Sequence, residues 1–222
     1  TPPWPAVALV VSGGHTSLYL VRDFLRIELL GQTVDDAAGE AFDKVAAILE
    51  LGYPGGPVID ALAREGNPAA IDFPRPWIRK PHFDFSFSGL KTAVLYHTYG
   101  GPHKYGSVAH LSWRQLADIA ASFQAALVET LVAKTVAAAE HAGVSTVVVG
   151  GGVAANSALR GALKQACTER GLTLHLTPLA YCTDNAAMVA ALGFRHWLAG
   201  ETADLGLEPR AGLQRPPRAT TA

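Results

Sequence analysis

Three consecutive glycines separate a β-branched apolar segment from a helical pattern, and this junction constrains the fold more than any other feature of the chain. In order, the sequence predicts a buried strand over 146–149, the glycine turn 150–152, a helix over 155–166, a strand over 172–176 and a helix over 184–198. Strands that alternate with helices are joined by right-handed crossovers and lie parallel. The last third of the chain therefore predicts a parallel sheet covered by helices.

The first two-thirds of the chain add antiparallel strands and further helices. Short apolar segments over 6–11, 17–21 and 25–30 are spaced as an antiparallel meander. Apolar residues then recur at helical spacing over 37–48, 58–65, 89–97 and 111–141, and the alternating segment 83–88 predicts a short strand. A meander followed by alternating helices and strands predicts an α/β fold with a mixed sheet, laid out like one lobe of an actin-like, ribonuclease-H-type protein.

The composition is that of a tightly packed α/β domain without a global attraction for nucleic acid. Of the 222 residues, 49% are hydrophobic and 17% are charged, against roughly 25% charged in ordinary soluble domains. The formal net charge is −1, so any contact with RNA has to be a local patch. Cys167 and Cys182 have no metal-binding spacing, which favours a reduced, cytoplasmic protein. The apolar run over 6–11 is far too short to span a membrane.

Two glycine-rich turns can bring backbone amides close to a phosphate. Gly13 and Gly14 lie between two predicted strands beside the hydroxyl of Ser12, and the missing Cβ atoms let a ligand approach the backbone. A plain hairpin turn explains the same residues. The glycines 150–152 open into a helix that starts near Asn156, which suits a nucleotide or, equally, an ordinary strand–helix turn with an asparagine cap.

An acidic segment forms the start of the helix predicted over 37–48. Asp36, Glu40 and Asp43 are spaced at four and three residues, so we expect them on one helical face. Their charges repel unless water, a cation or ligand hydroxyls separate them. The helix macrodipole favours acids in the first turn, which explains Asp36 but not Asp43. Gly39 costs about 1 kcal/mol inside a helix, which indicates a closely approaching ligand or neighbouring helix.

Three further segments are less specific. Residues 53–57 form a rigid turn by composition, and spacing does not say whether Gly56 accommodates a ligand. Residues 85–92 place Lys91 and two serines beside aromatic side chains, which fits a phosphate or RNA contact, or the strand edge that we favour. Asp184 precedes the last helix and would be an ordinary N-cap in most proteins.

Together these segments resemble the TsaD family of tRNA threonylcarbamoyltransferases. The matching segments occur in family order at 10–16, 35–44, 53–57, 85–92, 151–156 and 182–185. The resemblance implies the second lobe of an actin-like (ASKHA) fold over 1–205, with a helical insertion over about 57–140 and a tail over 206–222. We expect the family's first lobe to lie outside this chain.

The family transfers a threonylcarbamoyl group from threonylcarbamoyl-AMP to N6 of adenosine 37 in tRNAs that read codons starting with A. The resemblance therefore implies tRNA as a substrate and an ATP- or AMP-type nucleotide as part of the other substrate. Positions that match the family's nucleotide-binding residues are Val10, Val11, Ser12, Gly13, Gly14, Asp43, Gly56 and Asn156.

Asp184 matches a ligand of the family's active-site iron or zinc, which acts there as a Lewis acid and template. Two histidines four residues apart complete that site in the family, and no two histidines of this chain have that spacing. A catalytic metal usually needs three protein ligands. We therefore expect this chain alone to bind the metal weakly and to be inactive or nearly so.

The resemblance also implies a TsaB-like scaffold subunit and a TsaE-like ATPase subunit as partners, a cytoplasmic location and no membrane. A non-catalytic scaffold or nucleotide-binding subunit of the same superfold is an alternative. Such proteins usually lack the acidic helix and the Cys-Thr-Asp-Asn segment at 182–185, and both are present here. A sugar or acyl kinase of the superfold is left open by the chemistry of the residues, and the order of the motifs argues against it.

Overall fold

The computed structural model describes residues 3–101 and 106–208 and contains a five-stranded mixed sheet. Its strands are β1 (Ala6–Val11), β2 (Thr16–Val21), β3 (Ile27–Gln32), β4 (Thr146–Gly150) and β5 (Thr173–Leu176). The spatial order is β3-β2-β1-β4-β5, in which the first three strands form an antiparallel meander and β1, β4 and β5 run parallel. The mixed α/β sheet predicted from the sequence is confirmed.

The strands β1 and β4 lie at the centre of the sheet and carry much of its core. Their fully buried apolar residues are Ala6, Val7, Leu9, Val11, Val147 and Val149. The parallel register places Val10 opposite Gly150, so the chain leaves both strands at the same edge of the sheet. The turn 12–15 and the glycines 150–152 are therefore neighbours at the carboxyl ends of the strands, where open α/β sheets bind ligands.

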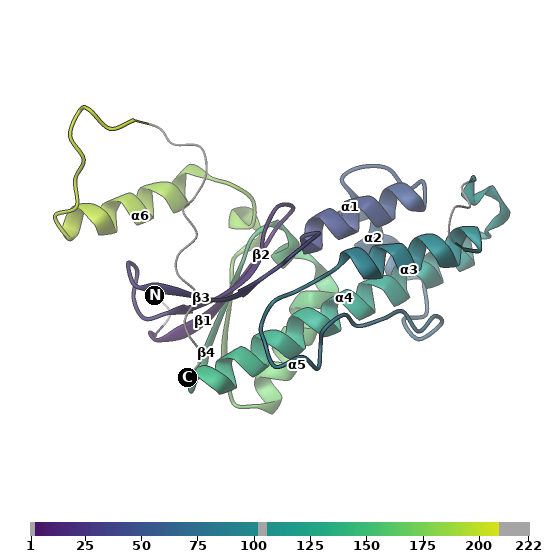
Figure 1. Ribbon diagram of the computed structural model, residues 1–222, viewed down its shortest axis with the longest axis horizontal. Coiled ribbons are helices and arrows are strands. Elements are labelled where there is room, and N and C mark those ends of the chain that lie inside the picture. The colour runs from purple at the N-terminus through teal and green to yellow at the C-terminus, as the bar shows by residue number, and fades with distance from the viewer. Residues whose placement is uncertain (1–2, 102–105, 209–222) are drawn as a thin grey trace.

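The helices are distributed unequally around the sheet (Figure 1). They are α1 (Ala38–Ile48), α2 (Gly55–Ala63), α3 (Ser88–Tyr99), α4 (Trp113–Ala142), α5 (Ser157–Glu169) and α6 (Ala186–Leu198), with short 3-10 turns η1 (Val108–His110), η2 (Gly152–Ala155) and η3 (Leu179–Tyr181). Helix α4 packs against β1, β2 and β4, and α5 packs against β5. Figure 1 shows α1, α2 and α3 grouped beyond one end of the sheet, while α6 stands apart on the opposite side.

Helix α4 is the central helix of the core. It begins at a capping box, in which Ser112 and Gln115 satisfy each other's backbone amides, and ends at Gly143 in the left-handed conformation (φ 64°). By length and composition α4 is apolar enough to cross a membrane, but 67% of that apolar window is buried inside the protein. Its apolar character is thus explained by packing in the core.

Helix α6 differs from the others because none of its side chains is buried. Its exposed apolar residues are Met188, Val189, Leu192, Phe194, Trp197 and Leu198. Its contact with the sheet region includes Arg195, whose guanidinium lies 4.0 Å from the centroid of the Phe24 ring. The helix therefore presents an apolar surface that the described residues leave uncovered.

Two predicted elements differ in the structure. The segment 83–88 is not a strand: it forms a single bridge between Phe85 and Thr33, because Phe85 and Phe87 are buried in the core and the two serines bind a carboxylate. Helix α2 begins at Gly55 rather than at residue 58, since Pro54 occupies the N-cap and the chain is already helical through the glycines. The tail predicted over 206–222 lies outside the described residues from position 209 onward.

Candidate functional site

A cavity of about 520 Å³ opens beside the carboxyl ends of β1 and β4, a volume typical of small-molecule sites. Its walls come from the β1–β2 hairpin, α1, the first turns of α2, η2 and the segment before α6. We call it the glycine cavity, after the four glycines that line it: Gly13, Gly39, Gly56 and Gly152. Segments far apart in the sequence thus meet at one place.

Half of the predicted substrate-binding residues line this cavity, namely Gly13, Asp43, Gly56 and Asn156. The others, Val10, Val11, Ser12 and Gly14, belong to the same strand and hairpin but do not line it. Val11 is fully buried beneath the turn into η2, and the side chain of Val10 is 38% exposed. The structure brings the segments together, and their binding of a nucleotide stays a prediction.

The β1–β2 hairpin turns through Gly13 and Gly14. The backbone amide of Ser12 donates to the carbonyl of His15 (2.8 Å), and the amide of His15 donates to Oγ of Ser12 (3.1 Å). A Cβ at Gly13 or Gly14 would meet no atom within 4 Å. No packing contact of a side chain therefore requires glycine at either position, and both residues are exposed.

Backbone-to-backbone packing holds this hairpin on both sides. A Cβ at Gly39 would lie 2.7 Å from the carbonyl oxygen of Ser12, to which the Gly39 amide donates (3.1 Å). Gly151 has φ 100° and meets the backbone of Val11, so a side chain there would be both strained and obstructed. The glycine inside α1 is thus explained by the backbone of the hairpin and not by a neighbouring helix, while a ligand against Gly39, which lines the cavity, stays a prediction.

Asp43 joins α1 to α2 and faces the cavity. Its Oδ1 accepts a hydrogen bond from the amide of Gly55 (2.8 Å), which satisfies a free N–H at the start of α2. Gly55 packs closely, because a Cβ there would lie 2.6 Å from the carbonyl oxygen of Phe42. The Oδ2 atom of Asp43 has no hydrogen-bond partner among the described residues. This oxygen is free to accept from ligand hydroxyls.

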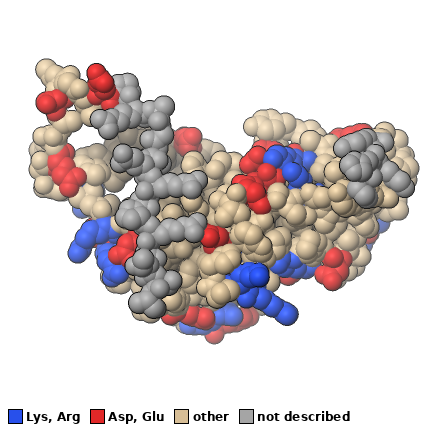
Figure 2. Space-filling model, viewed as in Figure 1, with Lys and Arg blue, Asp and Glu red and all other residues tan. Residues whose placement is uncertain are grey.

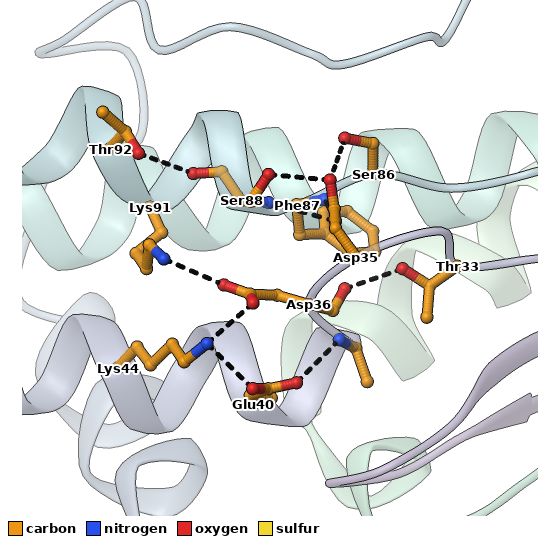
Figure 3. Close-up of polar contacts among 11 residues, drawn as sticks. Thr33, Asp35, Asp36, Glu40, Lys44, Ser86, Phe87, Ser88, Lys91 and Thr92 are labelled. Atoms are coloured by element: carbon orange, nitrogen blue, oxygen red, sulfur yellow. Dashed lines mark hydrogen bonds and ion pairs between the residues drawn. The ribbon is translucent and has the colours of Figure 1, made fainter.

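The other acids of this segment are neutralised by lysines, as Figure 3 shows. Lys44 Nζ lies 2.7 Å from Asp36 and 2.8 Å from Glu40, and Lys91 Nζ lies 3.3 Å from the second oxygen of Asp36. These contacts raise the pKa of Lys44 above its ordinary value, chiefly through the hydrogen bond to Asp36. The prediction of three acids on one helical face is wrong, since Asp36 precedes α1 and Asp43 turns to the cavity.

Asp35 fixes the start of α3 beside the start of α1 (Figure 3). It accepts from the hydroxyls of Ser86 (2.6 Å) and Ser88 (2.7 Å) and from the amides of Phe87 (2.8 Å) and Ser88 (3.2 Å). Partial burial raises the pKa of Asp35, but the four hydrogen bonds together outweigh burial and hold the pKa below its ordinary value. The serines and Lys91 are therefore engaged within the chain rather than directed at a ligand.

Asn156 has two structural partners at the wall of the cavity. Its Oδ1 accepts from the amide of Leu159 (2.9 Å), so it caps α5, and its Nδ2 donates to Oε1 of Gln124 on α4 (2.7 Å). The residue is 8% exposed. The cap predicted from the sequence is present, and the same side chain also lines the cavity.

Asp60 is a lining residue that the sequence did not indicate. Its oxygens accept from the hydroxyl (2.8 Å) and amide (3.3 Å) of Ser157 and from Arg64 (3.2 Å), which also lines the cavity. Asp60 lies one helical turn after Gly56, so both share a face of α2. A helix that begins at residue 58 does not include Gly56, so it does not place Gly56 and Asp60 on the same face. A helix that begins at Gly55 does.

Asp184 lies next to the cavity, directly after the lining residue Thr183, and is exposed. The N-cap of α6 is Asn185, which accepts from the amide of Met188 (3.1 Å), so the reading of Asp184 as the cap is wrong. In the described part of the chain no three His, Cys, Asp or Glu side chains are grouped to hold a metal. One carboxylate is too small a donor set for iron or zinc, and these residues alone do not fit such a site.

Comparison with solved structures supports the fold. The chain superposes on the crystal structure of T. kodakarensis HypF with a TM-score of 0.61 and 16% identity, over 88% of this chain and 34% of that one. At this identity the likeness concerns the fold alone. It agrees with the mixed sheet and flanking helices described above.

Comparison with known families and curated proteins is more specific. The family model for tRNA N6-adenosine threonylcarbamoyltransferase (TsaD) matches residues 1–191. Proteins of that name from Symbiobacterium thermophilum and Clostridioides difficile are 53% and 45% identical to this chain, over 96% and 95% of it. The chain spans about 60% of the length of these relatives. With a match over most of its residues, the chain belongs to the tRNA N6-adenosine threonylcarbamoyltransferase family.

Proposed function

We propose that this chain forms the nucleotide-binding lobe of an enzyme that transfers the threonylcarbamoyl group of threonylcarbamoyl-AMP to N6 of adenosine 37 in tRNAs reading codons that start with A. The observation that carries the proposal is the meeting of Gly13, Asp43, Gly56 and Asn156 around one cavity, in a chain half identical to transferases of that name. We place the activity in the cytoplasm, where tRNA is accessible.

The reaction joins an amine to an activated carbonyl. The N6 amine attacks the carbamoyl carbon, the bond from that carbon to the phosphate oxygen breaks, and AMP leaves with the electron pair while N6 releases a proton. The lobe contributes by holding the AMP part still, which converts an encounter of two molecules into a step within one complex. The amides of the exposed residues Gly13 and Gly14 would face the phosphate, and Oδ2 of Asp43 would accept from the ribose.

The whole activity needs residues beyond this chain. The curated relatives are longer, and the apolar face of α6 is uncovered in the described residues, which supports a further folded segment packed on it. Asp184 would be the contribution of this chain to a metal site, with the other ligands supplied from elsewhere. Scaffold and ATPase subunits of the TsaB and TsaE types complete the proposed assembly.

Calorimetric titration of this chain with AMP tests the proposed lobe. We expect AMP to bind, and Asp43→Ala to weaken the binding roughly tenfold, as the loss of one charge-assisted hydrogen bond predicts. Asp23→Ala is the matched control, because Asp23 is an acid of the β2–β3 turn that does not line the cavity. Equal affinity of the wild type and Asp43→Ala would exclude the cavity as the nucleotide site.

Transfer is tested on a longer polypeptide, in which the part of a relative that this chain does not cover is joined to this chain. Digestion of the tRNA and mass spectrometry of its nucleosides should show threonylcarbamoyladenosine when threonylcarbamoyl-AMP is supplied. Absence of the modified nucleoside, with AMP binding retained, would favour a non-catalytic nucleotide-binding subunit.

A further inference from the structure

The loop 74–82, which we call the basic loop, carries cations that the rest of the chain does not neutralise. Arg79 and Lys80 are exposed, and neither side chain has an ion pair, hydrogen bond or ring contact in the described structure. Among the other described lysines and arginines, Lys164 alone shares this property. In Figure 2, Lys and Arg atoms project from the lower middle of the face, over the loop that crosses in front of α4 in Figure 1.

The basic loop is held rigidly on α4 at both ends. Near its start, Arg75 forms two hydrogen bonds to Glu129 (2.8 and 3.2 Å) and a third to Asp72 (3.0 Å). At its end, the carbonyl of His82 accepts from the buried Lys134 of α4 (2.7 Å). Arg75 is thus occupied as an anchor, and its positive charge is balanced.

Between these anchors the backbone is constrained. The loop contains prolines at 74, 76 and 81, and Trp77 adopts φ 57°, which is rare for a bulky residue. Trp77 packs edge-to-face on His82 at 5.1 Å, and a hollow of about 550 Å³ lies against Arg75, Trp77, Ile78, Arg79 and Lys80. Two free cations are therefore presented beside an aromatic ring on a loop with little conformational freedom to lose on binding.

Resting on the proposed function, we propose that the basic loop binds the phosphate backbone of the tRNA substrate through Arg79 and Lys80. The net charge of −1 gives the chain no general attraction for RNA, so affinity has to come from a local patch. Asn156, at the wall of the glycine cavity, contacts Gln124 of α4, and Glu129 follows five residues later, roughly 8 Å along the helix. The same helix thus fixes the offset between the docked RNA and the cavity.

The test compares tRNA binding by this chain and by the double variant Arg79→Ala/Lys80→Ala. The probe is an unmodified transcript of a tRNA that reads a codon starting with A, with affinity measured by fluorescence anisotropy from about 50 to 200 mM KCl. We expect the variant to bind roughly tenfold more weakly, and the slope of log affinity against log salt to fall by about 2, since two phosphate contacts are lost. Lys164→Ala, which removes the equally unpaired cation on α5, should bind as the wild type does.

An unchanged affinity and slope in the double variant would overturn the proposal, as would equal losses in Lys164→Ala or no RNA binding by the wild type at the lowest salt. If the double variant kept its RNA affinity but no longer bound a scaffold-type subunit, the surface would belong to an acidic protein instead. AMP titration of the same samples separates this result from the proposed function. AMP binding should be equal in all three proteins, and its absence would contradict the cavity assignment and not the loop.

Discussion

The side chain of Asn156 donates a hydrogen bond of 2.7 Å to Oε1 of Gln124, and this buried contact joins the wall of the glycine cavity to helix α4. The same asparagine caps α5 through the amide of Leu159. One residue therefore connects the cavity to two helices, so its removal affects both the fold and the site.

Asn156→Ala should lower the free energy of unfolding by about 2–4 kcal/mol, because it removes a cap and leaves the buried Gln124 amide without its partner. Nucleotide affinity should fall as well. Asn185→Ala is the matched control: Asn185 caps α6 in the same way but at an exposed site, so about 1 kcal/mol or less is expected, with unchanged affinity. Urea unfolding and AMP titration measure the two effects, and equal unfolding midpoints for both variants would contradict the prediction.

Gly39→Ala should destabilise the chain by about 1–3 kcal/mol, although alanine is the better helix former, because the new Cβ would overlap the backbone of the hairpin. Gly161→Ala tests the same exchange in α5, where a Cβ meets nothing within 4 Å, and should stabilise by about 0.5–1 kcal/mol. Thermal unfolding measures both. A stabilised Gly39→Ala protein would show that the hairpin can move.

Acid should weaken the contact between Asp35 and the start of α3. The pKa of Asp35 is lower in the folded chain than in the unfolded one, because its four hydrogen bonds outweigh partial burial. Its stabilisation is therefore fully present above about pH 4 and is lost as the pH falls through the folded-state value. Asp35→Asn should remove part of this acid-dependent loss of stability. The double variant Ser86→Ala/Ser88→Ala should act in the same direction. Unfolding curves from about pH 2 to 6 measure the effect, and the same dependence of the free energy of unfolding on pH in the wild type and the variants would contradict the prediction.

The metal prediction concerns binding rather than fold. After incubation with zinc or iron and dialysis, this chain should retain far less than one ion per molecule, since Asp184 has no neighbouring ligands in the described structure. Asp184→Ala should change the free energy of unfolding by less than about 0.5 kcal/mol, because the residue is exposed and does not cap α6. In a complete enzyme the same substitution should abolish transfer. Elemental analysis decides the first point, and stoichiometric metal in the chain alone would contradict it.

Helix α6 should be the least protected helix in hydrogen exchange. None of its side chains is buried, so local opening exposes little additional surface. Its amides should exchange faster than those of α4 in this chain, and should slow when the polypeptide is extended to the length of its relatives. Mass-resolved exchange of peptides from both helices gives the comparison, and equally slow exchange of α6 in both proteins would rule out an added packing partner.

The positions of the strands and the proximity of the two glycine turns could be predicted from the sequence. Continuous β-branched segments that end in glycines are typical of buried strands, and few other structures suit them. Val7 and Val147 are buried in adjacent parallel strands as expected. The alternation over 83–88 misled for a physical reason. It reflects Phe85 and Phe87 buried in the core and serines bound to Asp35, a pattern that has the period of a strand but not its pairing.

Contacts that depend on distant segments could not be predicted. The residues around Asp60 in the sequence do not predict its hydrogen bonds to Ser157, which lies almost a hundred residues away. The partner of Gly39 is likewise set by the hairpin, since spacing within α1 says only that some group approaches. Lys44 lies between the carboxylates of Asp36 and Glu40 and neutralises both. Its spacing in the sequence permits this contact, but the sequence alone does not show whether lysine, water or a ligand separates the two acids.

Beside the glycine cavity, Gly39 and Gly151 pack directly against the backbone of the hairpin and of the strand that leads into it, with no side chain between them. Main-chain atoms have the same shape in every amino acid. A ligand that touches the main chain of the hairpin therefore meets the same atoms whichever side chains the hairpin carries. A side chain at Gly39 or Gly151, by contrast, would push the packed backbones apart. A change of nucleotide preference, in nature or in the laboratory, therefore has to come from side chains that line the cavity, such as Arg64, Val153 or Thr183. The backbone packing of the hairpin stays as it is.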